Sequence, residues 1–215
     1  MRESEKIDEL IAASRALYER KLIHAAGGNT SVRVGDFVWI SRTGAELGKL
    51  TEDQIVKIDL QGKVLKGTAP SKEMGMHLAM YRARRNAGAV VHVHPTYSIA
   101  HSTLISHETT DAVPPYTMAF YVRAGRVPII PYHPSGAHPL HEAVEALAPA
   151  YHAILLRQHG LIVAGADMSV AIGVVEEVEQ CCQISVATGL KGAPLTGAQL
   201  QAIDTALGRS WDDVP

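Results

Sequence analysis

Four short segments of β-type residues, joined by turns with no helix predicted between them, constrain the fold of this chain most. They read "SVRV", "FVWIS", "IVKIDL" and "VLKG", and all lie between residues 31 and 67. Strands that follow one another in this way pair antiparallel, because a parallel pair needs a long crossover connection. We therefore expect an α/β (α+β) fold with a central, mostly antiparallel β-sheet that is covered by helices.

The rest of the chain alternates helical patterns with apolar strands. We find no linker and no internal repeat in the 215 residues, so we expect a single domain over residues 1–215. Helices are predicted to about residue 22, over 71–86, after residue 95, over 138–148, over 167–190 and near the C-terminus, and further strands over 87–94, near 127–132 and over 153–165.

The composition excludes several classes of function. The formal net charge is −2, which gives no electrostatic basis for binding nucleic acid or an anionic membrane. No apolar run reaches the roughly 18 to 20 residues of a membrane span, and the charged N-terminal segment lacks the pattern of a signal peptide. The two cysteines, Cys181 and Cys182, are neighbours on a predicted helix and do not suit a disulfide. We expect a cytoplasmic protein.

An apolar strand in the middle of the chain ends in two histidines. His92 and His94 stand two residues apart, so on a strand their side chains share one face, about 6.5–7 Å apart. Two imidazoles at that spacing can reach one metal ion, and His159, which is predicted to end another apolar strand, offers a third ligand. Three protein ligands are typical of a catalytic zinc. With 11 histidines in the chain the pair alone also fits chance, and His77 and the remaining histidines are expected to be structural or solvated.

Three polar segments could bind a phosphate. Residues 71–73, "SKE", open a predicted helix, whose N-terminus attracts anions, and the lysine adds a positive charge. The turns "AGGNTS" and "RTGAELG" could direct backbone N–H groups into a concavity. Taken alone, each segment also fits an ordinary helix start or turn.

Together these segments resemble the class II aldolase/adducin family. The matching stretches, in chain order, are "GGNTS", "RTGAELGKL", "PSKE", "VVHVH" and "QHG", within residues 25–185. The resemblance implies one zinc ion per subunit on His92, His94 and His159. It makes Glu73 the catalytic acid/base, which also touches the metal in the unliganded enzyme.

The resemblance also implies the ligand and the assembly. The substrate would be a phosphorylated sugar or sugar acid, and the protein a homotetramer with sites at the subunit interfaces. The phosphate would be held by Gly28, Asn29, Thr43, Gly44, Ser71 and Lys72.

Within the family, three segments look more like the branch that decarboxylates 3-oxo-tetronate 4-phosphates to dihydroxyacetone phosphate and CO2; they read "RTGAELGKL", "PSKE…HLAMYR" and "VRAGRVPIIPY". The sugar-phosphate aldolases usually carry a serine at position 72, whereas the decarboxylases typically carry one where this chain has Pro95. Both reactions would pass through a metal-stabilised enediolate. An L-fuculose-1-phosphate-type aldolase therefore stays open, as do a pentulose-phosphate 4-epimerase and a non-catalytic adducin-like binding module. Tyr116, Tyr121 and Tyr132 are candidates for a second proton donor.

Overall fold

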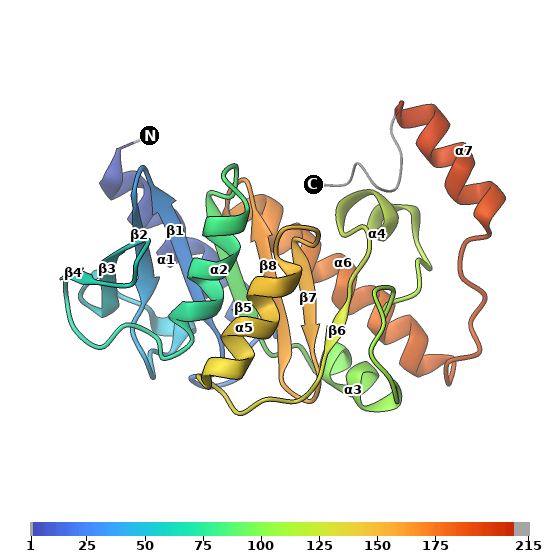
Figure 1. Ribbon diagram of the computed structural model, residues 1–215, viewed down its shortest axis with the longest axis horizontal. Coiled ribbons are helices and arrows are strands. Elements are labelled where there is room, and N and C mark those ends of the chain that lie inside the picture. The colour runs from blue at the N-terminus through green and yellow to red at the C-terminus, as the bar shows by residue number, and fades with distance from the viewer. Residues whose placement is uncertain (1, 209–215) are drawn as a thin grey trace.

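One eight-stranded β-sheet runs through the computed structural model, which describes residues 2–208 (Figure 1). Its strands lie in the order β4-β3-β2-β1-β5-β8-β7-β6, and every neighbouring pair is antiparallel except β6 and β7. The predicted mostly antiparallel sheet is thus confirmed. The strands are β1 (Asn29–Val34), β2 (Phe37–Ser41), β3 (Ile55–Asp59), β4 (Val64–Lys66), β5 (Ala89–Val93), β6 (Ile129–Ile130), β7 (Ala153–Leu156) and β8 (Gly160–Gly165).

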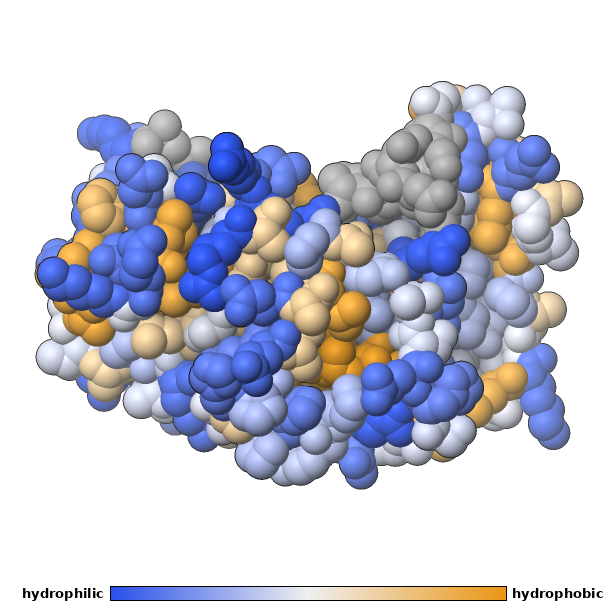
Figure 2. Space-filling model, in the orientation of Figure 1, coloured by the Kyte–Doolittle hydropathy of each residue, from blue (hydrophilic) through white to orange (hydrophobic). Residues whose placement is uncertain are grey.

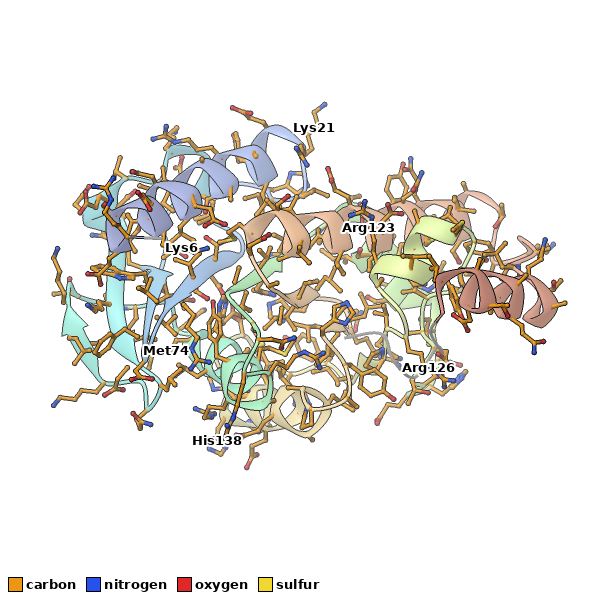
Figure 3. All side chains as sticks on the ribbon, turned by 90° about the horizontal axis from the view of Figure 1, so that it is seen from above. Lys6, Lys21, Met74, Arg123, Arg126 and His138 are labelled. Atoms are coloured by element: carbon orange, nitrogen blue, oxygen red, sulfur yellow. The ribbon has the colours of Figure 1, made fainter. Side chains whose placement is uncertain are left out.

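Helices cover both faces of the sheet. Buried residues of α1, α4 and α6 pack against one face, and those of α2 and α5 pack against the other, as the view from above also shows (Figure 3). The helices are α1 (Glu3–Glu19), α2 (Met74–Ala83), α3 (Thr96–Leu104), α4 (Met118–Arg123), α5 (His138–Leu147), α6 (Met168–Ala187) and α7 (Gly197–Leu207), with short 3-10 turns over Leu47–Lys49 and Glu52–Gln54.

The central strand β5 is buried on both faces, and the alternation of its side chains decides where its histidine points. Ala89, Val91 and Val93 pack in the core under α1 and α6. Val90 packs in the core under α2 and α5. Because successive strand side chains point to opposite faces, His92 is directed toward α2 and α5.

The helix that was predicted over 71–86 is shorter in the structure and begins at Met74. The residues before it cannot be helical because they pair with a neighbouring segment: Ser71 N donates to the carbonyl of Ser41, and Thr43 N donates to that of Ala69. This pairing is long-range, so the local pattern of the sequence did not contain it.

His159 was predicted to end a strand, but it lies in the turn between β7 and β8. β7 already ends at Leu156, and Gln158 adopts a positive φ of 55° to reverse the chain. The turn still brings His159 beside the end of β5, because Val93 pairs with Leu161 across the sheet. Helix α4 was not predicted.

The C-terminal helix α7 projects away from the sheet, beyond α4 (Figure 1). It contributes no buried residue, and Leu207 is 46% exposed. Figure 2 shows hydrophobic surface along this arm, at the right of the view. Among the helices of residues 2–208, none combines the length and apolar character that crossing a membrane requires.

Candidate active site

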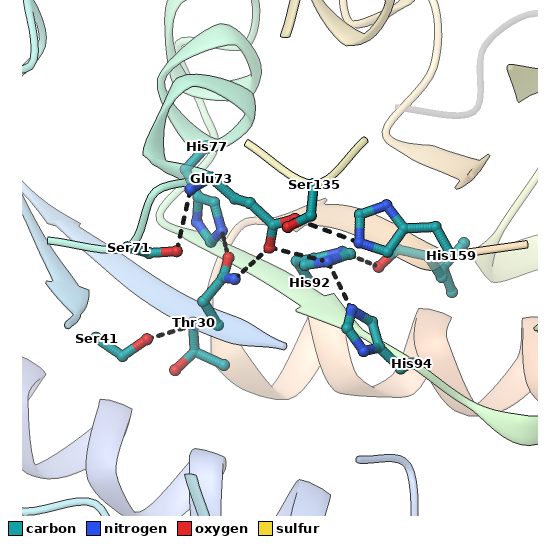
Figure 4. Close-up of polar contacts among 11 residues, drawn as sticks. Thr30, Ser41, Ser71, Glu73, His77, His92, His94, Ser135 and His159 are labelled. Atoms are coloured by element: carbon teal, nitrogen blue, oxygen red, sulfur yellow. Dashed lines mark hydrogen bonds and ion pairs between the residues drawn. The ribbon is translucent and has the colours of Figure 1, made fainter. Parts of the chain in front are cut away.

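Three histidines from two neighbouring strand ends converge on one point (Figure 4). The ring centroids of His92 and His94 lie 4.8 Å apart, those of His92 and His159 lie 4.9 Å apart, and those of His94 and His159 lie 5.1 Å apart. One ligand atom of each ring lies within 4.8 Å of the others. The structure therefore brings together the three residues that the sequence analysis predicted as metal ligands.

The orientation of His92 suits a metal ligand. Its Nδ1 lies 3.1 Å from the carbonyl oxygen of Leu161, to which it can donate a hydrogen bond. With Nδ1 protonated in this way, the lone pair of Nε2 would be directed at the cluster, an arrangement common behind metal-bound histidines; a neutral ring protonated at Nε2 would donate to Glu73 instead. His94 Nε2 lies only 3.0 Å from His92 Nε2. Two nitrogen atoms this close need either a shared proton or a cation to satisfy their lone pairs.

Burial favours the neutral form of His94. The pKa of His94 falls to about 3, first because burial penalises the charged ring and then because His92 and His159 lie close by. Neutral imidazole is the form that binds a metal. A donor set of three imidazole nitrogens within reach of one point fits a divalent cation such as zinc.

Glu73, the residue directly before α2, completes the cluster. Its side chain is almost fully buried, with Oε2 3.3 Å from His92 Nε2 and Oε1 3.3 Å from His159 Nε2. Burial raises the pKa of this carboxyl, but hydrogen bonds from His159 and His92 outweigh it, so the pKa lies below its ordinary value. The structure thus favours an ionised Glu73, which can act as a base or as a metal ligand.

Gly28 and Asn29, two of the predicted phosphate-binding residues, lie directly at the cluster. Gly28 has a φ of +79°, and a Cβ on it would stand 2.6 Å from the carbonyl oxygen of His92, so only glycine fits there. Asn29 pairs with His92 across the sheet, and its Nδ2 donates to Glu73 Oε2 at 2.8 Å.

The other predicted phosphate-binding residues lie on two segments that run side by side. Thr43 and Gly44 are exposed on one segment and Lys72 on the other. Ser71, which was expected to help hold the phosphate, is buried, and its Oγ accepts a hydrogen bond from Glu73 N at 3.2 Å. The positive charge of Lys72 stands one residue from Glu73, at the surface.

The three candidate tyrosines lie in different surroundings. Tyr121 is buried, and its hydroxyl donates to Asp204 of α7 at 2.6 Å. Tyr132 is 58% exposed, and Tyr116 packs partly buried at the edge of the core. No hydrogen bond in the described part of the chain joins any of them to Glu73 or the histidines.

Two residues of the site were missed by the sequence analysis. Ser135 donates to Glu73 Oε1 at 2.6 Å from the loop before α5. His77, expected to be structural or solvated, is fully buried and bonds to Asn29. The spacing of Glu73, His77 and Tyr81, four residues apart on one helix face, could have indicated the second. The loop of Ser135 carries no such pattern.

A buried carboxylate beside three histidines, at the end of two strands of an antiparallel sheet, defines a candidate metal-dependent enzyme. The sequence of residues 8–186 matches the family model described as the class II aldolase and adducin N-terminal domain. The chain belongs to the class II aldolase/adducin family.

Named relatives and solved structures agree with this assignment. The chain is 35% identical over 176 residues to the 3-oxo-tetronate 4-phosphate decarboxylase of Haemophilus influenzae, an alignment that covers 81% of this chain and 84% of that one. It is 33% identical over 179 residues to the L-fuculose phosphate aldolase of Methanococcus maripaludis, covering 83% of this chain and 95% of that one. The crystal structure of YgbL from Klebsiella pneumoniae superposes with a TM-score of 0.89 at 30% identity, over 94% of this chain and 99% of the other.

These findings confirm the predicted family and fold class. The prediction that the protein is an enzyme is also confirmed, because the decarboxylase and the aldolase named above are both carbon–carbon lyases.

Proposed function

We propose that this protein decarboxylates a 3-oxo-tetronate 4-phosphate to dihydroxyacetone phosphate and CO2, as a cytoplasmic homotetramer with one zinc ion per subunit. The observation that carries the proposal is the convergence of Glu73 with His92, His94 and His159 in a chain 35% identical to a decarboxylase of that name. All four groups that the reaction needs are present, which argues against a non-catalytic binding module. A pentulose-phosphate 4-epimerase has less support.

The chain's own residues supply the cation site and the proton transfer. A divalent cation on the three histidines would act as a Lewis acid that withdraws electrons from the substrate carbonyl. Glu73 is ionised in the structure, so it would take up a proton from solvent before delivering one to the carbon from which CO2 departs. Asn29 and Ser135 each donate to one of its oxygens, so its carboxylate keeps one orientation next to the histidines.

The phosphate end of the substrate would lie against the exposed turn of Thr43 and Gly44 and against Lys72. Gly44 has a positive φ of 72° and open space on its side-chain side, so its backbone is accessible to an anion. Gly28, Asn29 and Ser71 line the inner side of the same region, since each contacts His92 or Glu73.

An L-fuculose-1-phosphate-type aldolase is the second candidate. It is favoured by the 33% identity to the named archaeal aldolase, which extends over 95% of that protein. It would use the same histidines and Glu73 but release an aldehyde instead of CO2.

The test is a coupled assay for dihydroxyacetone phosphate on zinc-loaded protein. The two epimers of 3-oxo-tetronate 4-phosphate and L-fuculose 1-phosphate are offered in parallel. We expect product from a tetronate, and a loss of kcat in Glu73→Gln on the order of the 10²- to 10⁴-fold that a general acid or base contributes. His94→Ala is expected to lose both the activity and the zinc that copurifies with the protein, measured by elemental analysis.

His152→Gln is the matched control, because His152 is a buried histidine that bonds to the carbonyl of Arg123, away from the site. It should keep both zinc and activity. Product from fuculose 1-phosphate alone would make the protein an aldolase, and no product from any of the three would refute the proposed substrate class.

A further inference from the structure

A chain of buried hydrogen bonds runs from the interior of α2 to Glu73. His77 Nε2 lies 2.6 Å from Asn29 Oδ1, and His77 Nδ1 lies 2.7 Å from Ser31 Oγ. The hydroxyl of Tyr81 lies 2.9 Å from the same Ser31 Oγ. At the other end, Asn29 Nδ2 donates to Glu73 Oε2 at 2.8 Å.

The backbone explains why these five groups meet. Glu73, His77 and Tyr81 are spaced four residues apart, so they share one face of α2 and its N-terminal turn. Asn29 and Ser31 are two residues apart on β1, so they share the face of the sheet that α2 covers. One helical turn of α2 therefore advances about as far as two residues of β1. Asn29 lies beside Glu73 and His77, and Ser31 lies beside His77 and Tyr81.

The protons in this series of hydrogen bonds can be placed one by one. The fully buried ring of His77 is neutral, since burial lowers its pKa to about 3, and it therefore carries one N–H. If that proton is on Nε2, the ring donates to Asn29 Oδ1 and accepts from the Ser31 hydroxyl. The amide of Asn29 is then turned with its NH2 group toward the carboxylate.

The alternative arrangement places two acceptors against each other. If the His77 proton were on Nδ1, its bare Nε2 would face Asn29, and the amide would turn its NH2 group toward the ring. Asn29 Oδ1 would then oppose Glu73 Oε2, and a buried carboxylate facing a carbonyl oxygen is costly.

We infer that His77 is a positioning residue for Glu73: its Nε2–H fixes the Asn29 amide in the orientation that donates to the carboxylate. The inference rests on the proposed role of Glu73 as the catalytic acid/base. His77 itself is fully buried, so no atom of its side chain is exposed to a substrate at the surface. It acts only through Asn29.

The first test needs neither substrate nor metal. Long-range proton–nitrogen NMR spectra of metal-free protein with ¹⁵N-labelled histidine report which ring nitrogen of His77 carries the proton, and the signals that vanish in His77→Gln identify the residue. We expect a neutral ring protonated at Nε2. A ring protonated at Nδ1, or at both nitrogens, at neutral pH overturns the inference.

The second test compares two amide substitutions. The Gln side chain can place an N–H roughly where Nε2 lies, whereas the Asn side chain is one carbon shorter and reaches only the position of Nδ1. We expect His77→Asn to lower kcat on the order of 10- to 100-fold, the usual effect of removing such a supporting hydrogen bond. His77→Gln should keep most of kcat, and KM should stay near its original value in both.

Equal losses of kcat in the two variants would indicate a purely structural role and would overturn the inference, as would no loss in either. His152→Gln again reports the effect of replacing a buried histidine elsewhere, and thermal unfolding is followed for all three variants. If the unsubstituted protein turns over none of the three substrates, the proposed function fails, while the NMR spectrum of that same protein still decides the position of the His77 proton.

Discussion

At the scale of single residues, the most informative feature is how many partners hold one carboxylate. Glu73 lies within hydrogen-bond distance of Asn29 and Ser135, and within 3.3 Å of the nearest nitrogens of His92 and His159. A cation held by the two histidines would take their lone pairs, so they could no longer donate to Glu73. The two hydrogen bonds from Asn29 and Ser135 would then remain as its fixed supports.

Buried neutral histidines predict how stability depends on pH. The pKa of His77 falls to about 3 and that of His152 to about 4, both mainly through burial, whereas the ordinary value is 6.5. Below pH 6.5 the unfolded chain binds protons that the folded chain does not. The contribution of each group to stability is therefore fully present above that pH. It is lost by about 1.4 kcal/mol per pH unit as the pH falls, down to about 4 for His152 and about 3 for His77.

Urea unfolding of the metal-free protein between pH 7.5 and about 5 measures this decline. His152→Gln removes one of the buried neutral histidines, so its free energy of unfolding should fall less steeply over the same range. An equal slope in the variant and the unsubstituted protein would show that the folded state does take up a proton at this position.

At the scale of elements, the contact between β5 and β8 determines whether the histidines meet. Gly160 begins β8, and a Cβ there would overlap the carbonyl oxygen of Val93 and stand 2.9 Å from the ring of His94. We expect Gly160→Ala to destabilise the fold on the order of 1–3 kcal/mol, because neither backbone can move without breaking the ladder. Zinc affinity should fall as well, as a competition titration with a chelator would show.

Gly197→Ala is the matched control. A Cβ on Gly197, the first residue of α7, meets no atom within 4 Å, and its φ is not positive. Alanine should therefore be neutral or slightly stabilising there, with unchanged zinc affinity. The idea of a tight β5–β8 contact would be wrong if both alanine variants behaved alike.

The elements also show what a sequence can and cannot predict. The direction of the His92 side chain was predictable from β5 alone, because successive side chains of this five-residue strand point to opposite faces of the sheet. The start of α2 was not, because residues 69–71 are held by Ser41 and Thr43 from another part of the chain. Ser135 was missed for the same reason: its place over Glu73 depends on how α5 packs against α2, not on local pattern.

At the scale of the whole molecule, the arm formed by α7 bears on the predicted homotetramer. Leu200, Ile203 and Leu207 lie on one face of this helix, and none of them is buried within the described chain. We expect this face to pack against another subunit. Leu207→Glu should then shift the mass measured by light scattering toward smaller species, because burying an unpaired charge in an interface is costly.

Ala202→Glu places the same charge on the opposite face of α7 and should leave the assembly unchanged. If the unsubstituted protein is a monomer in light scattering, the predicted assembly is wrong. A tetramer that tolerates Leu207→Glu would place the interface elsewhere on the molecule.

The order of strands in the sheet has a consequence for how the protein is made. The ribosome synthesises the chain from its N-terminus, so β1 to β4 can fold as a meander before the second half of the chain has been synthesised. β5 lies between β1 and β8, and His159 joins its two partners only once β8 has been synthesised and paired. A nascent chain therefore lacks the complete set of three histidines, and we expect the full metal site to form only after β8 has paired with β5.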